Sequence, residues 1–185
     1  APEVKSSMRL AQPPRKLSLF GEFCFQTVAR YGREHHPKNC LLTDDKISGL
    51  SLGTHFEMWN EPNLNPDPDA TWGGWAGTME QYYEMMRYGA MASKEADSAA
   101  IVTSAGYAGM TVEVIDSIRT YTYADGSHPL DYIDVINVHY YSGRIPPETA
   151  TEDGNLGRTG TQTLPENLEE LVAWRDRYAP KKPIW

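Results

Sequence analysis

The chain has 185 residues, of which 40% are hydrophobic and 23% are charged, enough for one folded domain with its own core. Its net charge of −8 argues against nucleic acid or an anionic membrane as the main partner, because both attract basic surfaces. No apolar run approaches the roughly 20 residues of a spanning helix, and residues 1–16 lack the layout of a signal peptide.

The first predicted elements are a helix and a strand. Apolar residues at helical spacing predict a helix over Leu17–Tyr31, which would bury the thiol of Cys24. A loop follows, and its Cys40 fits no common metal-ligand spacing with the histidines before it, so no metal is expected. Residues 50–60 are expected to form a strand that ends in Trp-Asn-Glu-Pro. Proline at 62 disfavours a helical conformation for Glu61, as the end of a strand requires.

The second half of the chain alternates in the same way. Helices are predicted over residues 78–95, 111–121 and 165–178, and strands over residues 100–105 and 132–141, with another strand beginning at 182–185. A loop rich in Gly, Thr and Pro separates the second of these strands from the last helix. Such alternation is typical of βαβ units, so the expected fold is α/β with a parallel sheet, in a single domain over residues 1–185.

Element order alone leaves a closed barrel and an open sheet both possible. No Gly-x-Gly-x-x-Gly follows a strand, so the phosphate-binding loop typical of open nucleotide-binding sheets is missing. Polar residues gather instead at strand ends, Glu61 on one strand and His139 with Tyr141 on another. Alternation puts His139 and Tyr141 on the same side of their strand, and in a barrel all such ends open onto one face. Tyr107 could reach the same cleft.

The run Trp-Asn-Glu-Pro-Asn at residues 59–63, with His-Tyr-Tyr 78 positions after Glu61, resembles clan A of the retaining glycoside hydrolases, which are (β/α)8 TIM barrels. The resemblance implies that Asn60 hydrogen-bonds the sugar 2-hydroxyl and that Glu61 is the acid/base. It implies that His139 and Tyr141 line the sugar site. The expected activity is retaining hydrolysis of O-glycosidic bonds in an oligo- or polysaccharide, without a cofactor. Extracellular polysaccharides would favour secretion, although no residue pattern indicates a compartment.

The chemistry of this class requires a second carboxylate. A retaining mechanism uses one carboxylic acid to protonate the leaving oxygen and one carboxylate, roughly 5 to 5.5 Å away, to attack the sugar. In clan A the nucleophilic Glu ends strand seven, which here would lie just beyond Trp185. The resemblance therefore implies a partial barrel, from about helix 3 to the start of strand 7 and incomplete at both ends. The rest of the barrel would be its partner, and the chain alone would be inactive.

Several aromatic and acidic residues have two readings. Trp59 is expected to be a substrate-binding residue and would also provide an apolar setting that helps the acid to stay protonated. Trp72 and Trp75 are candidates for stacking on sugar rings. Trp72 and Trp75 are equally compatible with a hydrophobic plug that anchors their loop. Glu57 is expected to face inward toward a basic partner. The tetrad itself could be an ordinary turn with a solvated acid.

Two other functional classes remain open. A carbohydrate-binding pseudoenzyme would keep the cleft and the tryptophans but lack the nucleophile. A metal-dependent hydrolase would need histidines at ligand spacing, and neither His-x-His nor His-Glu-x-x-His occurs.

Overall fold

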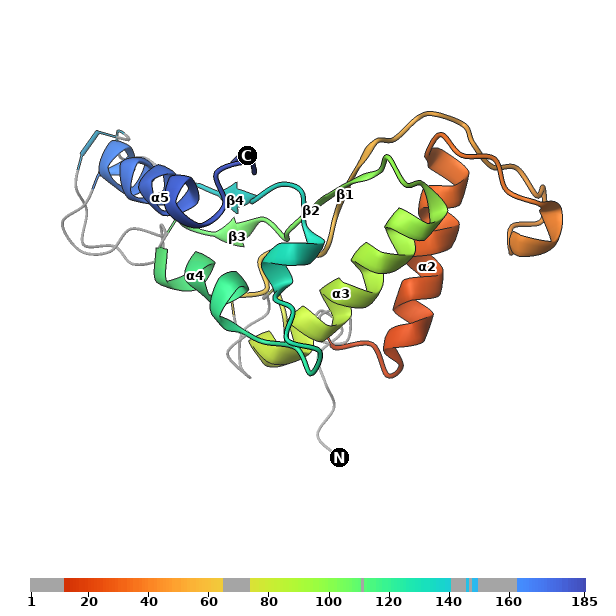
Figure 1. Ribbon diagram of the computed structural model, residues 1–185, viewed down its shortest axis with the longest axis horizontal. Helices are drawn as coiled ribbons and strands as arrows, with labels where there is room; N and C mark the ends of the chain where they lie inside the picture. Colours follow the sequence, from red (N-terminus) through yellow and green to blue (C-terminus); the bar gives the residue numbers. More distant parts are fainter. Residues whose placement is uncertain (1–11, 65–73, 111, 141–145, 147, 150–162) are drawn as a thin grey trace.

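A computed structural model describes residues 12–64, 74–110, 112–140, 146, 148–149 and 163–185. It contains the helices α2 (Leu17–Tyr31), α3 (Met79–Ala96), α4 (Val112–Thr120) and α5 (Leu164–Tyr178) (Figure 1). The strands are β1 (His55–Glu57), β2 (Ile101–Thr103), β3 (Tyr107–Ala108) and β4 (Val138–His139). Short 3-10 turns cover Lys38–Cys40 and Pro129–Tyr132. The four predicted helices are confirmed, and α2 has the predicted bounds.

Two of the helices begin at a capping box. Thr78 accepts a hydrogen bond from the backbone N–H of Gln81, whose side chain accepts from the backbone of Thr78. Thr163 and Glu166 form the same reciprocal pair at the start of α5. Each box satisfies two backbone donors that the first helical turn leaves without a partner. Local sequence therefore fixes where these helices start.

The paired strands are all parallel, and their order in space follows their order in the chain. Phe56 of β1 lies opposite Val102 of β2, and Ala108 of β3 lies opposite His139 of β4. Single bridges extend this pattern from Thr103 to Val135 and from Ile136 to Ile184. Each step to the next parallel segment passes through a helix, as βαβ connections require. The α/β fold class is thus confirmed; the described residues contain few strands and no closed barrel.

The strand predicted over residues 50–60 is wrong in length. Residues 49–53 donate backbone hydrogen bonds to the last carbonyls of α2 and to that of its C-cap Gly32; within the helix, Gly49 donates to Ala29, Leu50 to Arg30 and Leu52 to Tyr31. A helix leaves its final carbonyls unpaired, and this segment satisfies them instead of joining the sheet. Strand structure is therefore limited to His55–Glu57.

The strand predicted over residues 132–141 is also shorter than expected. Pro129 starts a 3-10 turn that includes Tyr132, so pairing begins only at Val135, and regular strand structure covers Val138–His139. Strand β3, by contrast, was not predicted. Its two residues lie beyond the predicted strand end at Ala105 and pair with β4.

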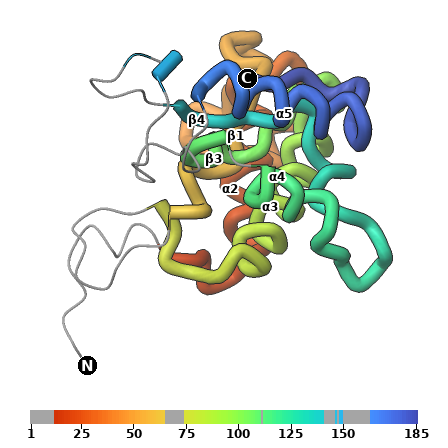
Figure 2. The backbone as a smooth tube through the Cα atoms, turned by 90° about the vertical axis from the view of Figure 1, so that its left-hand side faces the viewer, coloured from red at the N-terminus to blue at the C-terminus, as the bar shows by residue number. Residues whose placement is uncertain are grey.

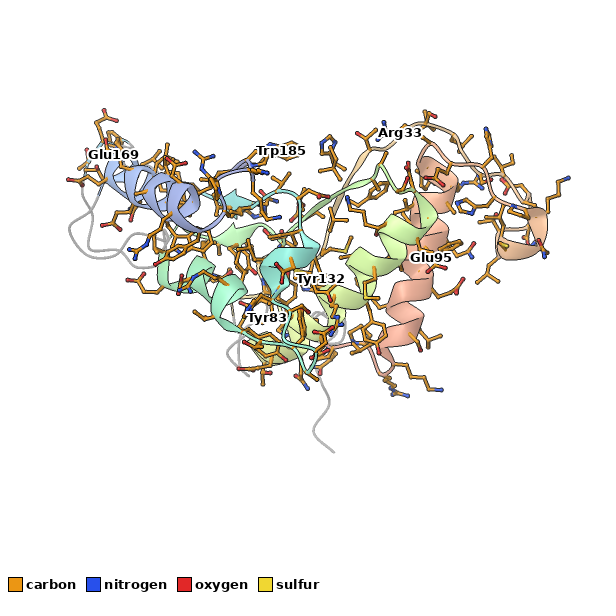
Figure 3. The ribbon with its side chains drawn as sticks, viewed as in Figure 1. Arg33, Tyr83, Glu95, Tyr132, Glu169 and Trp185 are labelled. Carbon is orange, nitrogen blue, oxygen red and sulfur yellow. The ribbon has the colours of Figure 1, made fainter. Side chains whose placement is uncertain are left out.

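The core lies between the strands and the helices. Seen end on, helices α3, α4 and α5 lie to one side of the strands (Figure 2). Phe56 and Val102 pack into this core, whereas His55 and Glu57 on the opposite face of β1 are exposed. Tyr83 and Tyr132 belong to its large aromatic component between α3 and α4 (Figure 3). Of the helices described, none is long and apolar enough to cross a membrane.

Candidate functional site

The backbone at Glu61 has an unusual conformation. After β1 ends, Trp59 has φ of 90° and Glu61 has φ of 45°, both in the left-handed region that non-glycine residues rarely occupy. Each such residue costs about 1–3 kcal/mol and persists only where its surroundings enforce it. The backbone N–H of Glu61 donates to Gly106 O at 3.0 Å, and Asn60 forms a parallel bridge with Gly106. The end of β1 is thus tied to the segment between β2 and β3.

The side chain of Trp59 fixes the other side of this turn. Its indole N–H donates to Gly74 O at 2.6 Å, and its ring meets Trp75 edge-on with 5.2 Å between centroids. A methyl group at position 74 would lie 1.8 Å from the carbonyl oxygen of Glu61. The main chain at residue 74 can therefore lie against the backbone of Glu61 only because that residue is glycine.

Glu61 and His139 meet across the strand ends. Glu61 Oε1 and His139 Nδ1 are hydrogen-bonded at 3.1 Å, and their side chains are 20% and 27% exposed. The carboxyl group is thus partly shielded yet reachable from solvent. A carboxyl group held by an imidazole at the carboxyl ends of parallel strands is suited to proton transfer to or from a bound molecule.

Three further residues support this arrangement and were not predicted as site residues. The carbonyl of Gly106 accepts the backbone N–H of Glu61, and its Cα faces the ring of His139. The amide of Asn63 donates from Nδ2 to Ala108 O and accepts from Ala108 N–H at Oδ1, both at 2.9 Å. Gly74 is the third. The place of Asn63 in the Trp-Asn-Glu-Pro-Asn run was a signal in the sequence for its role. No sequence pattern distinguishes Gly74 and Gly106 from the other glycines of the chain.

The remaining sequence-based candidates have different outcomes. Asn60 is exposed and Trp59 is half-buried, so both are accessible beside Glu61. Trp75 is fully buried, and its indole N–H donates to Thr78 O at 2.8 Å. It has no exposed face for a sugar, which favours the alternative of a loop-anchoring plug. Trp72 and Tyr141 lie outside the described residues.

Two other expectations about the cleft need correction. Within the part of the chain that the structure describes, Glu57 forms no ion pair with a basic side chain; its Oε1 accepts the backbone N–H of Gly106 at 2.8 Å. Tyr107 is fully buried against Tyr82, so it does not reach the cleft. Burial raises the pKa of Tyr107 well above its usual range, which keeps the phenol neutral. Its ring therefore supports the site from behind as part of the core.

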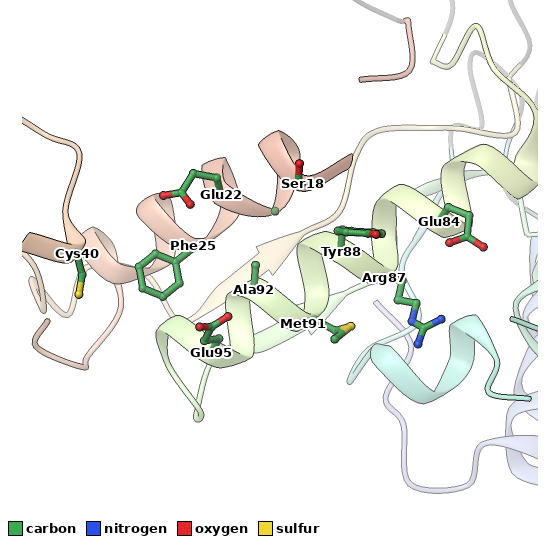
Figure 4. Close-up of a pocket in the computed structure, with 11 residues that line it drawn as sticks. Ser18, Glu22, Phe25, Cys40, Glu84, Arg87, Tyr88, Met91, Ala92 and Glu95 are labelled. Atoms are coloured by element: carbon green, nitrogen blue, oxygen red, sulfur yellow. The ribbon is translucent and has the colours of Figure 1, made fainter. Parts of the chain in front are cut away.

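Two cavities lie near α2. One, of about 340 Å³, borders Glu57 and Trp59 and is lined mainly by apolar side chains of α2 and β1, among them Phe20 and Phe23. The other, of about 640 Å³, is a groove between α2 and α3 that shares no residue with the site (Figure 4). Within the described part of the chain, no three His, Cys, Asp or Glu side chains are grouped so that they could hold a metal ion.

Comparison with known proteins points to carbohydrate-active enzymes. No family profile matches the chain. Over 43 residues it is 49% identical to a β-xylosidase of Caldicellulosiruptor saccharolyticus, a stretch that is 23% of this chain and 8% of the xylosidase. Its structure resembles a glucosidase of Croceicoccus marinus with a TM-score of 0.53 and 18% identity, over 94% of this chain and 30% of the glucosidase chain. The chain thus spans less than a third of either relative; the short sequence match supports a relationship to glycoside hydrolases, and the structural match supports a similar fold.

Proposed function

We propose that this chain is the central part of a retaining O-glycosidase of the clan A type, with Glu61 as the acid/base. The observation that carries the proposal is the hydrogen bond between Glu61 and His139, which are 78 positions apart in the chain and come from different strand ends. The substrate is an oligo- or polysaccharide, in keeping with the carbohydrate-active relatives.

The proposed roles follow from the chemistry of glycoside hydrolysis. Glu61 gives a proton to the leaving oxygen and later removes one from the attacking water. Asn60, exposed beside it, hydrogen-bonds the sugar 2-hydroxyl, a contact that strengthens as positive charge develops on the sugar ring. His139 orients the carboxyl group of Glu61 through its Nδ1 and, with Tyr141, lines the sugar site.

A barrel architecture is part of the proposal. The rings of His55 and Trp185 have centroids 4.7 Å apart, although two parallel segments lie between their strands. In a flat sheet those strands would be roughly 14 Å apart, since neighbours are spaced by about 4.8 Å. This short distance indicates that the sheet curves toward the face that carries His55, which supports the wall of a barrel. Among the described residues β1 is paired on one edge only, and its other edge, with the exposed ring of Phe23 beside it, would receive a preceding βα unit.

The nucleophile is proposed to be a Glu on the strand that Trp185 begins. A Glu within about ten residues after Trp185 in the full-length protein, with its carboxyl group roughly 5 to 5.5 Å from that of Glu61, would complete a retaining pair. Binding of oligosaccharide without turnover by that full-length protein would instead favour a carbohydrate-binding pseudoenzyme.

The test is Glu61→Gln in the full-length protein. We expect kcat on substrates with poor leaving groups to fall by about 10²–10⁴, because general acid catalysis is lost. An aryl glycoside with a good leaving group needs little protonation, so its first step should suffer much less. Glu84→Gln is the matched control, since Glu84 is also half-buried and accepts one hydrogen bond, from Tyr121, but lies on α3. Equal losses on both substrates would refute the acid role.

A further inference from the structure

Gly106 uses both of its backbone polar groups to hold the end of β1. Its N–H donates to Glu57 Oε1 at 2.8 Å, and its carbonyl oxygen accepts the N–H of Glu61 at 3.0 Å. Asn60 lies opposite Gly106 in a parallel bridge. The position of residue 106 therefore determines where the backbone of Glu61 lies.

The Cα of Gly106 faces the ring of His139. A Cβ at position 106 would lie 2.0 Å from Nε2, 2.4 Å from Cδ2 and 2.6 Å from Cε1 of that ring. Unbonded heavy atoms prefer separations of about 3.5–4.0 Å, so a methyl group and the ring cannot both occupy their places. The φ of Gly106 does not lie in the left-handed region that favours glycine. Glycine is needed here for close approach and not for its conformational freedom.

The backbone of His139 is held in place, so only its ring could move away from a methyl group at position 106. Gly109 N–H donates to His139 O at 2.8 Å, and His139 is paired with Ala108 in the β3–β4 ladder. With the main chain held, a methyl group at 106 can be accommodated only if the imidazole rotates away. That rotation would take Nδ1 out of hydrogen-bond distance of Glu61 Oε1.

Building on the proposed function, we propose that Gly106 is a positioning residue for the acid/base: its missing side chain is the space that lets His139 reach Glu61. Gly106 touches no reacting atom in this role. Its backbone holds the backbone of Glu61, and its missing side chain leaves room for the imidazole of His139. Gly106 therefore positions both partners of the hydrogen bond.

The experiment uses Gly106→Ala in the full chain, with Gly53→Ala as the matched control. A methyl group at position 53 would lie 3.5 Å from the ring of Phe56, an ordinary contact. The readout is the NMR signal of the His139 imidazole, assigned by its loss in His139→Ala. Glu61→Gln should shift that signal in the wild-type and Gly53→Ala backgrounds and leave it unchanged in the Gly106→Ala background. A shift that survives in Gly106→Ala would overturn the proposal.

A stability cycle tests the cause of the effect. Gly106→Ala should lower the Tm of the wild type by roughly 4 °C or more, because it overpacks a held ring. In the His139→Ala background the ring is absent, so the same change should lower the Tm much less. If Gly106→Ala alone does not fold, folding of the double variant supports the proposal; an unfolded double variant beside a folded His139→Ala overturns it.

Neither readout requires turnover, which separates the two proposals. Suppose that coupling between Glu61 and His139 depends on Gly106 but that Glu61→Gln loses activity equally on both substrates. That combination would refute the acid role of Glu61 and leave the positioning role of Gly106 in place. Unequal losses on the two substrates, with coupling that does not depend on Gly106, would refute only the role of Gly106.

Discussion

The amide of Asn63 should stabilise the site loop measurably. It makes two hydrogen bonds of 2.9 Å to the backbone of Ala108, in the geometry of one paired peptide group. Each neutral hydrogen bond contributes about 0.5–1.5 kcal/mol net, so the pair is worth about 1–3 kcal/mol. Ala108 is only half-buried and water can replace part of the loss, so we expect Asn63→Ala to lower the free energy of unfolding by about 1–2 kcal/mol.

Urea unfolding monitored by tryptophan fluorescence would measure this loss, with a matching fall in Tm of about 2–8 °C for a chain of this size. Asn39→Ala is the matched control, because Asn39 is exposed and its side chain accepts a 3.8 Å contact from the thiol of Cys40. Asn63→Asp keeps the acceptor for Ala108 N–H but places a second oxygen against Ala108 O, so it should not restore stability. If Asn63→Ala and Asn39→Ala differ by less than about 0.5 kcal/mol, the reasoning is refuted.

Two further predictions concern the core. Trp75→Ala should cost about 3–5 kcal/mol in urea unfolding, since the indole is fully buried, whereas Trp185→Ala, at a residue 53% exposed, should cost much less; similar losses would contradict the plug assignment. Burial raises the pKa of Cys24 to about 12, while an unfolded thiol ionises near about 8.5, so the folded state holds its proton more tightly. The thiol of Cys24 therefore makes its full contribution to the free energy of unfolding below about pH 8.5. That contribution falls by about 1.4 kcal/mol per pH unit as the pH rises toward 12. Cys24→Ala should reduce, by that amount, the slope with which the free energy of unfolding falls above about pH 8.5. Cys40→Ala, at an exposed thiol, should leave that slope unchanged. Equal slopes in the two variants would refute the burial argument.

The sequence by itself determined the helices and the order of the elements. Helical spacing of apolar residues and capping residues such as Thr78 act within a few positions, so they can be recognised in one dimension. Cys24 was correctly expected to be buried for the same reason. The proximity of Glu61 and His139 could be expected because the carboxyl ends of parallel strands open onto one face.

Only the tertiary structure decided the lengths of the strands and the surroundings of the site. Residues 49–53 resemble the start of a strand, yet they satisfy the last carbonyls of α2, which lies beside them only in the folded chain. Whether Trp75 would be exposed or buried depended on its packing against Trp59 and its hydrogen bond to Thr78. The role of Gly106 depends on a ring 33 positions away. Contacts between distant segments create these constraints, because a residue's free space is set by neighbours that local sequence does not specify.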